Sequence, residues 1–228
     1  MMIHANNPPE YRPRIAVVDF GAGNLRSVVQ ALRIVGAEPL ITGRADEIAA
    51  ADGIVFPGDG AARSAMAGLA ERDLVGPVRD AVRSGRPFLG VCLGLQVLMS
   101  HSDEDGGVEC LGIIPGTVVR LRGDLKIPHM GWNQVRQRRA HRIFDGVPDL
   151  SDFYFVHSYV AVPDDPADIL GETDYAGDFA SIIGRGNLVA TQFHPEKSAT
   201  IGIQLYRNFV RWVAESTLTG SRAAVEYV

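Results

Sequence analysis

A cysteine framed by two glycines constrains this chain more than any other feature, because it predicts a sharp turn between a strand and a helix. The stretch from Gly90 to Gln96 reads GVCLGLQ. Residues 86–91, entered through Pro87, form an apolar run that predicts a short buried strand, and the pattern over 93–100 predicts a helix. This is the cysteine form of the Gly-x-nucleophile-x-Gly elbow, where a helix N-terminus favours a reactive thiolate and supplies N–H donors for an oxyanion. Taken alone, the stretch is equally compatible with a buried structural cysteine in a glycine-rich turn.

A histidine and a glutamate near the C-terminus favour a reactive cysteine. Residues 190–198 read ATQFHPEKS and follow an apolar run. A nucleophilic thiol needs a base, and the base needs a group that orients it. His194 is suited to take the proton, and Glu196 to hold the other imidazole nitrogen. A lone histidine is more often structural, but together with the elbow the pattern predicts a triad of Cys92, His194 and Glu196.

These motifs carry a resemblance to a known family. GVCLGLQ together with FHPEKS resembles the class I, or triad, glutamine amidotransferases, which release ammonia from glutamine through a thioester on the cysteine. Three further blocks, DFGAGNLRSV (19–28), KIPHMGWN (126–133) and FYFVHSY (153–159), resemble the subfamily of glutaminase subunits of imidazole glycerol phosphate synthase, in histidine biosynthesis. The resemblance covers residues 14–213.

The resemblance implies roles for further residues of the site. It implies an oxyanion hole made by the backbone N–H groups of Asp59 and Leu93. The chain departs from the family at Asp59, where an apolar residue such as valine is common, and we expect this carboxylate to face outward. The resemblance also implies that glutamine is contacted by Gly60, Gln96, Ser158 and Tyr159.

The same resemblance implies a partner. The chain has no second catalytic domain, so the ammonia must be used on another polypeptide, which the resemblance identifies as a cyclase subunit of (β/α)₈ fold. Its products are imidazole glycerol phosphate and the aminoimidazole carboxamide ribotide (AICAR). The residues expected at the interface are Asn24, His129, Gly131, Trp132 and Asn133.

Several of these stretches have structural alternatives that the residues alone leave open. Gly21 and Gly23 follow a first strand and suit a tightly packed turn. A phosphate-binding turn fits them less well, because the third glycine of the dinucleotide-binding fingerprint is missing. Trp132 suits either a core position or an interface anchor. The polar residues at 157–159 end an apolar strand, where they either bind a small amino acid or point into water.

Three other functions fit parts of the sequence. The first is a glutaminase feeding another synthase, such as one for aminodeoxychorismate or pyridoxal phosphate, and the blocks at 19–28 and 126–133 speak against it. The second is a cysteine hydrolase of the same core fold, which the complete set of glutamine-binding positions disfavours. The third is a non-catalytic interaction module, which the intact triad disfavours.

Composition sets the broad class. The chain has 228 residues and a net charge of −5, and it lacks a basic cluster of the kind that binds nucleic acid. The two cysteines do not make a disulfide framework, and we expect Cys110 to be a small buried apolar residue. There is no 18-residue apolar run and no signal-peptide pattern, so we expect a cytoplasmic protein outside the membrane. No cofactor is implied, and the acidic loop at 101–107 lacks metal-ligand spacing.

The pattern predicts a single α/β domain. We expect a disordered extension at 1–13, a class I glutamine amidotransferase domain at 14–217 and a C-terminal tail at 218–228. The domain should have a central, mostly parallel sheet flanked by helices, with an antiparallel or mixed portion added in its C-terminal half. Asn24 is expected to cap a first helix. The strands expected after residue 108 are 116–121, 133–136, 152–156, 159–162, 179–183 and 188–192, the last two joined in a hairpin by the turn at 184–187.

Overall fold

The first half of the chain builds a parallel sheet. The structure is a computed structural model, and it describes residues 11–21 and 23–220. The central strands of this sheet are apolar runs whose residues are almost all buried, as expected of a parallel sheet covered on both faces. In spatial order the parallel strands are β2 (Glu38–Thr42), β1 (Arg14–Val18), β3 (Gly53–Gly58), β4 (Phe88–Cys92) and β13 (Leu188–Thr191).

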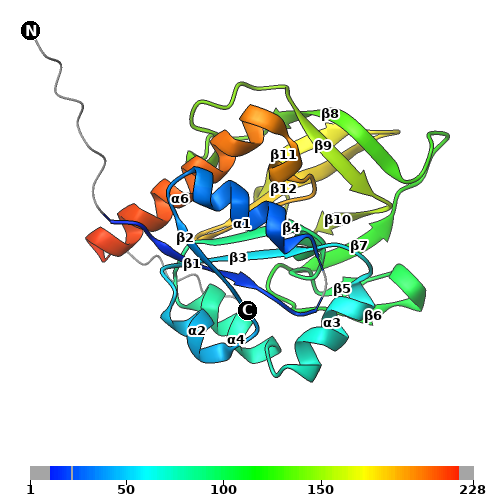
Figure 1. Ribbon diagram of the computed structural model, residues 1–228. Coiled ribbons are helices and arrows are strands. Elements are labelled where there is room, and N and C mark those ends of the chain that lie inside the picture. The colour runs from blue at the N-terminus through cyan, green and yellow to red at the C-terminus, as the bar shows by residue number, and fades with distance from the viewer. Residues whose placement is uncertain (1–10, 22, 221–228) are drawn as a thin grey trace, which may run out of the picture.

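Helices cover both faces of this sheet (Figure 1). One face packs against α1 (Leu25–Ile34) and α6 (Ala199–Thr219), and the other against α2 (Ala45–Ala50), α3 (Ala62–Glu71) and α4 (Val75–Arg83). Two hydrophobic clusters result, one on each face of the sheet. The site at the end of β4 is therefore carried by a rigid, doubly covered layer.

The C-terminal half extends the sheet with antiparallel strands. Beyond β13 the order continues through β12 (Asp178–Arg185), β10 (Tyr159–Pro163), β7 (Gly116–Arg120), β5 (His101–Ser102) and β6 (Val108–Glu109), with β5 parallel to β7. A branch leaves β12 through β11 (Ile169–Asp174) to β8 (His129–Gln137) and β9 (Ser151–His157). The 3₁₀ turns are η1 (Glu104–Gly106), η2 (Arg142–Phe144), η3 (Pro166–Asp168) and η4 (Pro195–Lys197).

The predicted fold class is confirmed, including the mixed second half and the hairpin at 184–187. Some details were wrong. The helix expected over 93–100 is only the single turn α5 (Leu93–Gln96), and β11 was not predicted. Asn24 does stand at the N-cap of α1, but its side chain makes no capping hydrogen bond to any described residue, because its backbone has φ −83° and ψ 67° rather than the extended conformation of a capping residue.

The expected ends of the domain stay predictions. Residues 1–10 of the expected extension and 221–228 of the expected tail lie outside the described residues. Pro13 is buried, and its carbonyl accepts a hydrogen bond from the Glu38 N–H at 2.9 Å. In the described part of the chain, none of the helices combines the length and apolar character needed to cross a membrane. The same residues hold no cluster of three or more potential metal ligands.

Candidate active site

Cys92 stands on a strained turn that its neighbours make possible. It ends β4 and precedes α5 with φ 55° and ψ −108°, a conformation that side-chain-bearing residues rarely adopt. A Cβ on Gly94 would lie 1.8 Å from the Phe56 carbonyl oxygen, and one on Gly90 would lie 2.9 Å from the Cβ of Ala190. Both glycines are therefore required for the turn to approach its neighbouring strands, as the sequence pattern predicted.

The sheet register brings two other segments to Cys92. Gly58 of β3 pairs with Cys92, and Thr191 of β13 pairs with Val91. Since the carboxyl ends of parallel strands share one edge, the loop after β3 and the segment after β13 both meet the elbow there. That edge unites segments that are far apart in the sequence.

His194 and Glu196 form a buried pair beside the elbow. The Nδ1 atom of His194 lies 2.7 Å from Oε1 of Glu196, and the two side chains are 5% and 2% exposed. The N–H of His194 donates to the Tyr154 carbonyl, and its own carbonyl accepts from the Ser198 hydroxyl at 2.7 Å. The imidazole thus has a fixed backbone and a fixed orienting carboxylate.

The environment of His194 favours its protonated form. Burial lowers the pKa of His194, but interactions with the sulfur of Cys92 and the carboxylate of Glu196 outweigh burial and raise this pKa to about 9. Among the described residues, Nε2 of His194 and Oε2 of Glu196 have no hydrogen bond of ordinary geometry. Catalytic hydrogen bonds are often long before substrate binds, so Nε2 remains suited to exchange a proton with Cys92 or a ligand.

Two buried residues that the sequence analysis did not assign also contact the triad. Gln192 donates from Nε2 to the sulfur of Cys92 at 3.7 Å. Tyr206 of α6 is fully buried, and burial first, then the charge of Glu196, raises the pKa of its hydroxyl well above the usual value. The signal for Gln192 was its place directly before the FHPE segment, but Tyr206 lies in an amphipathic helix where an aromatic side chain is ordinarily core.

The residues expected at the oxyanion hole and the glutamine pocket gather around the same edge. Leu93 is buried directly after Cys92, and Gln96 follows one turn later. Asp59 is exposed, in line with the expectation that it faces outward, and Gly60 has φ 91°. Ser158 joins β9 to β10, and Tyr159 is the first residue of β10. The backbone carbonyl of Tyr159 accepts a hydrogen bond from the side chain of Gln96 at 3.0 Å.

The residues expected at a partner interface fall in two places. Gly23, directly before Asn24, lies against the end of β3, since a Cβ added to it would lie 3.3 Å from the Cα of Gly58. His129, Gly131, Trp132 and Asn133 lie on β8, where side chains alternate between the two sides of the strand. Trp132 is 54% exposed, so it is not a core residue, whereas His129 is buried at 3%.

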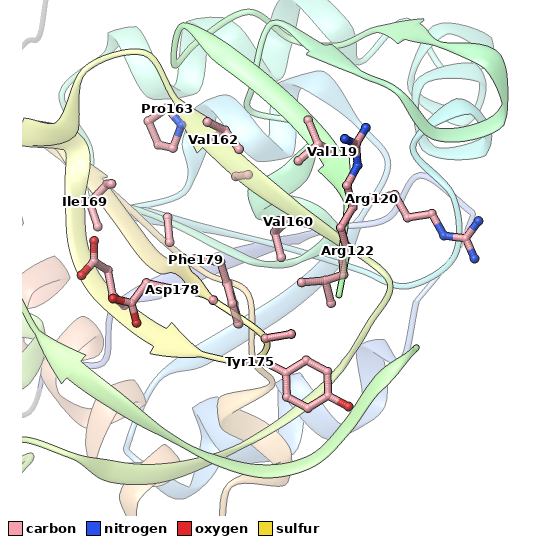
Figure 2. A pocket seen from close by; sticks show the side chains of 16 residues that line it. Val119, Arg120, Arg122, Val160, Val162, Pro163, Ile169, Tyr175, Asp178 and Phe179 are labelled. Carbon is pink, nitrogen blue, oxygen red and sulfur yellow. The ribbon is translucent and has the colours of Figure 1, made fainter. Parts of the chain in front are cut away.

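An open pocket lies apart from the triad. It has a volume of about 510 Å³ and opens over the antiparallel half of the sheet, between β7, β10, β11 and β12. Figure 2 shows its apolar wall of Val119, Val160 and Phe179, with Tyr175 at one end. Its lining, all within the described residues, includes no member of the triad. The chemistry of the elbow rather than the size of this cavity identifies the candidate active site.

Comparisons with known proteins define the class. Residues 16–212 match the family described as glutamine amidotransferase class-I. A solved structure of a glutamine amidotransferase is similar over 88% of this chain and 98% of its own, with a TM-score of 0.68 and 20% identity, which shows the shared fold. The chain belongs to the class I glutamine amidotransferase family.

The similar curated proteins carry a more particular name. Imidazole glycerol phosphate synthase subunit HisH of Nitrosococcus oceani is 50% identical over 203 residues, which cover 87% of this chain and 97% of that protein. The protein of the same name from Dehalococcoides mccartyi is 48% identical over 197 residues, covering 86% of this chain and 96% of its own length. The resemblance drawn from the sequence motifs is confirmed at the level of both family and subfamily.

Proposed function

We propose that this chain is a glutaminase subunit that releases ammonia from glutamine and passes it to a cyclase subunit in histidine biosynthesis. The observation that carries the proposal is the cysteine on a strained elbow beside the buried His194–Glu196 pair. Its likeness to the HisH subunits over nearly their whole length supports the choice of substrate and partner.

The first half of the reaction makes a thioester. The thiolate of Cys92 attacks the side-chain amide carbon of glutamine, and the N–H groups of Asp59 and Leu93 stabilise the oxyanion. The C–N bond then breaks while His194 gives its proton to the leaving nitrogen, and ammonia departs. A pKa of about 9 supports this role, because the imidazole is then protonated at neutral pH. Glu196 keeps the imidazole in place through Nδ1.

The second half restores the thiolate. Water attacks the glutamyl thioester as His194 takes a proton from the water, the C–S bond breaks with its electron pair on sulfur, and glutamate leaves. We propose that Gly60, Gln96, Ser158 and Tyr159 hold the glutamine during both steps. This assignment is supported by their position around the elbow and by the hydrogen bond from Gln96 to the Tyr159 carbonyl.

We propose the outer side of β8 and the Asn24 loop as the surface for the cyclase. Met130 and Trp132 are 63% and 54% exposed on the same side of β8, and exposed large apolar side chains are typical of interface anchors. Gly23, next to Asn24, adjoins Gly58, which directly precedes the proposed oxyanion donor Asp59. This proximity supports an effect of cyclase docking on the active site. Strands β8 and β9 lie side by side along one edge of the molecule (Figure 1). We propose a cytoplasmic location, because a reducing compartment suits a free thiol nucleophile.

A chloroketone analogue of glutamine tests the proposal. It should alkylate Cys92 stoichiometrically, glutamine should protect the thiol, and peptide mass spectrometry should locate the adduct. The buried thiol of Cys110, whose pKa burial raises to about 11, is the internal control and should stay unmodified. Modification that glutamine does not slow, or that falls equally on both cysteines, would contradict the proposed substrate site.

A further inference from the structure

Two buried histidines have no part in the proposed reaction. Nδ1 of His129 lies 3.0 Å from Nε2 of His157, and the residues are only 3% and 6% exposed. Burial lowers the pKa of His129 to about 4, and burial together with the neighbouring His129 lowers that of His157 to about 3. Both imidazoles are therefore neutral at physiological pH, so each has one donor and one acceptor nitrogen.

The contacts of this pair allow a single set of tautomers. The Tyr159 carbonyl only accepts, so the Nδ1 of His157, 3.0 Å away, must carry the proton. Nε2 of His157 is then the acceptor for Nδ1–H of His129, and Nε2 of His129 is the acceptor for the Asn133 amide at 3.3 Å. The Asn133 amide is oriented independently, because its oxygen accepts from the Gln134 N–H at 2.8 Å. Each of the four ring nitrogens therefore has a fixed role, either as hydrogen-bond donor or as acceptor.

The hydrogen bonds continue from Tyr159 to the nucleophile. Nε2 of Gln96 donates to the Tyr159 carbonyl at 3.0 Å and to Oε1 of Gln192 at 3.2 Å. Nε2 of Gln192 in turn contacts the sulfur of Cys92 at 3.7 Å. We call this series the His–Gln line, and its members are Asn133, His129, His157, the Tyr159 carbonyl, Gln96, Gln192 and Cys92.

Aromatic packing holds the imidazoles of the line in place. The ring of His129 is stacked between Phe155, at a centroid distance of 4.7 Å, and Tyr175, at 3.9 Å. Phe179 lies 5.2 Å from His157. Tyr175 and Phe179 also line the cavity in Figure 2, so the line runs directly behind one of its walls. A side chain so enclosed transmits a displacement rather than absorbing it by changing rotamer.

The line begins on the strand that carries the exposed tryptophan. Because successive side chains of a strand point to opposite sides, Met130 and Trp132 lie outward where His129 and Asn133 lie inward. We propose that His129 and His157 are positioning residues, and that a cyclase seated on the outer side of β8 acts through the His–Gln line on Gln96 and Cys92. This inference rests on the proposed glutaminase function and adds a route by which the partner regulates it.

Substitutions at His157 separate its two hydrogen bonds. The side-chain amide of His157→Asn can occupy the Nδ1 position and keep a donor for the Tyr159 carbonyl, whereas that of His157→Gln reaches the Nε2 position and loses this donor. With saturating cyclase, His157→Gln should raise the KM for glutamine about tenfold, or about 1.4 kcal/mol. His157→Asn should recover most of that loss while still weakening the stimulation of glutamate release by the cyclase. A structural role alone would not restore the KM in His157→Asn while leaving the stimulation by the cyclase weakened.

His141 provides the matched control. It is another histidine whose pKa is lowered to about 4, chiefly by burial, but it packs against Trp212 away from the line. His141→Asn should leave the KM and the stimulation by cyclase as in the wild type. Far-UV circular dichroism and the urea midpoint report whether each variant is folded.

A second variant covers the case in which His157→Gln does not fold. His129→Asn can keep the donor to His157, but it loses the bond from Asn133 and the ring stacking on Phe155 and Tyr175. The chain should fold and lose most of the stimulation by cyclase. Folded His157→Gln or His129→Asn with wild-type KM and stimulation would overturn the proposal.

One readout is independent of glutamine and of the partner. The rate at which iodoacetamide alkylates Cys92 in the isolated chain should differ between His157→Gln and the wild type by about threefold or more, and stay unchanged in His141→Asn. If the wild type releases no glutamate from glutamine, the proposed function fails, and this measurement still decides whether the line acts on the thiol. Equal alkylation rates in all three proteins would show that it does not.

Discussion

The protonation of His194 decides whether the proposed chemistry can begin. Burial opposes a charge on this imidazole, while Cys92 and Glu196 favour it and raise the pKa from the usual 6.5 to about 9. Since the folded pKa lies above the unfolded value, protonation stabilises the folded chain fully below about pH 6.5. That contribution is lost as the pH rises through about 9.

We expect a Cys92→Ala variant to have a lower pKa at His194 than the wild type, because the sulfur is one of the groups that raise it. Nitrogen-15 NMR of the imidazole over about pH 5–10 measures both values, since this range includes the ordinary pKa of about 6.5 and the raised pKa of about 9. The Cys110→Ser chain, altered at a thiol outside the site, is the control and should titrate as the wild type. An imidazole pKa that Cys92→Ala leaves unchanged would show that the thiol and the ring do not interact.

The backbone N–H of Asp59 is the second donor in the proposed oxyanion hole. The residue is exposed, and we propose no role for its carboxylate. Asp59→Val should therefore keep glutaminase activity within about tenfold, which is about 1.4 kcal/mol of barrier. Steady-state glutamate release by the complex measures this. A thousandfold loss in a folded variant would show that the carboxylate takes a direct part.

At the scale of elements, the elbow between β4 and α5 depends on close approach to β3. A Cβ on Gly94 would meet the Phe56 carbonyl oxygen at 1.8 Å, and neither backbone can move without disturbing the sheet. Gly94→Ala should lower the free energy of unfolding by about 3 kcal/mol or more. Urea denaturation of the full chain gives the value.

Gly76 in α4 is the matched control for that substitution. Apart from its chain neighbours and the backbone of its own helix, no described residue lies within 4 Å of a Cβ added there, and its φ is not positive. Gly76→Ala should therefore change the free energy of unfolding by less than about 1 kcal/mol, because the gain from replacing a glycine in the first turn is opposed by the crowding of a Cβ against Pro77. Equal effects of the two alanines would mean that the approach of Gly94 to Phe56 is not what shapes the elbow.

The elements that the sequence predicted well are those with one dominant signal. The apolar strands and the elbow glycines have such signals, because burial on both faces and close backbone approach each restrict the residue type. Strand β11 lacks one, since ILGETD has only weak alternation and its pairing with β12 includes register irregularities. The helix after Cys92 was predicted too long because the apolar residues 97–99 are buried in turns rather than on one helix face.

Motifs located the candidate site, but they did not reveal its supporting contacts. The FHPE segment identified His194 and Glu196, whereas the contacts of Gln192 with Cys92 and of His129 with His157 join residues far apart in the sequence. The topology of the mixed sheet brings those residues together, and no local pattern encodes it.

For the molecule as a whole, the proposed function requires a partner on the outer side of β8. Trp132 is a large exposed aromatic side chain and should be an anchor there. Trp132→Ala should weaken binding of the cyclase by about 2 kcal/mol, which raises the Kd roughly thirtyfold. Isothermal titration calorimetry with the two purified subunits provides the measurement.

Leu218 is the control for exposed apolar area. It is 64% exposed on α6, away from β8, and Leu218→Ala should leave the Kd unchanged. If Trp132→Ala binds as the wild type does, or if Leu218→Ala weakens binding as much, the cyclase docks elsewhere.

The proposed function divides the chemistry between two subunits: Cys92 releases ammonia, and the partner consumes it. Synthesis of imidazole glycerol phosphate by the complex, assayed with either glutamine or ammonium as the nitrogen source, separates the two activities. With Cys92→Ala in place of the wild type, we predict no synthesis from glutamine and unimpaired synthesis from ammonium. Synthesis from glutamine near the wild-type rate, or loss of synthesis from both sources in a folded, assembled complex, would contradict it.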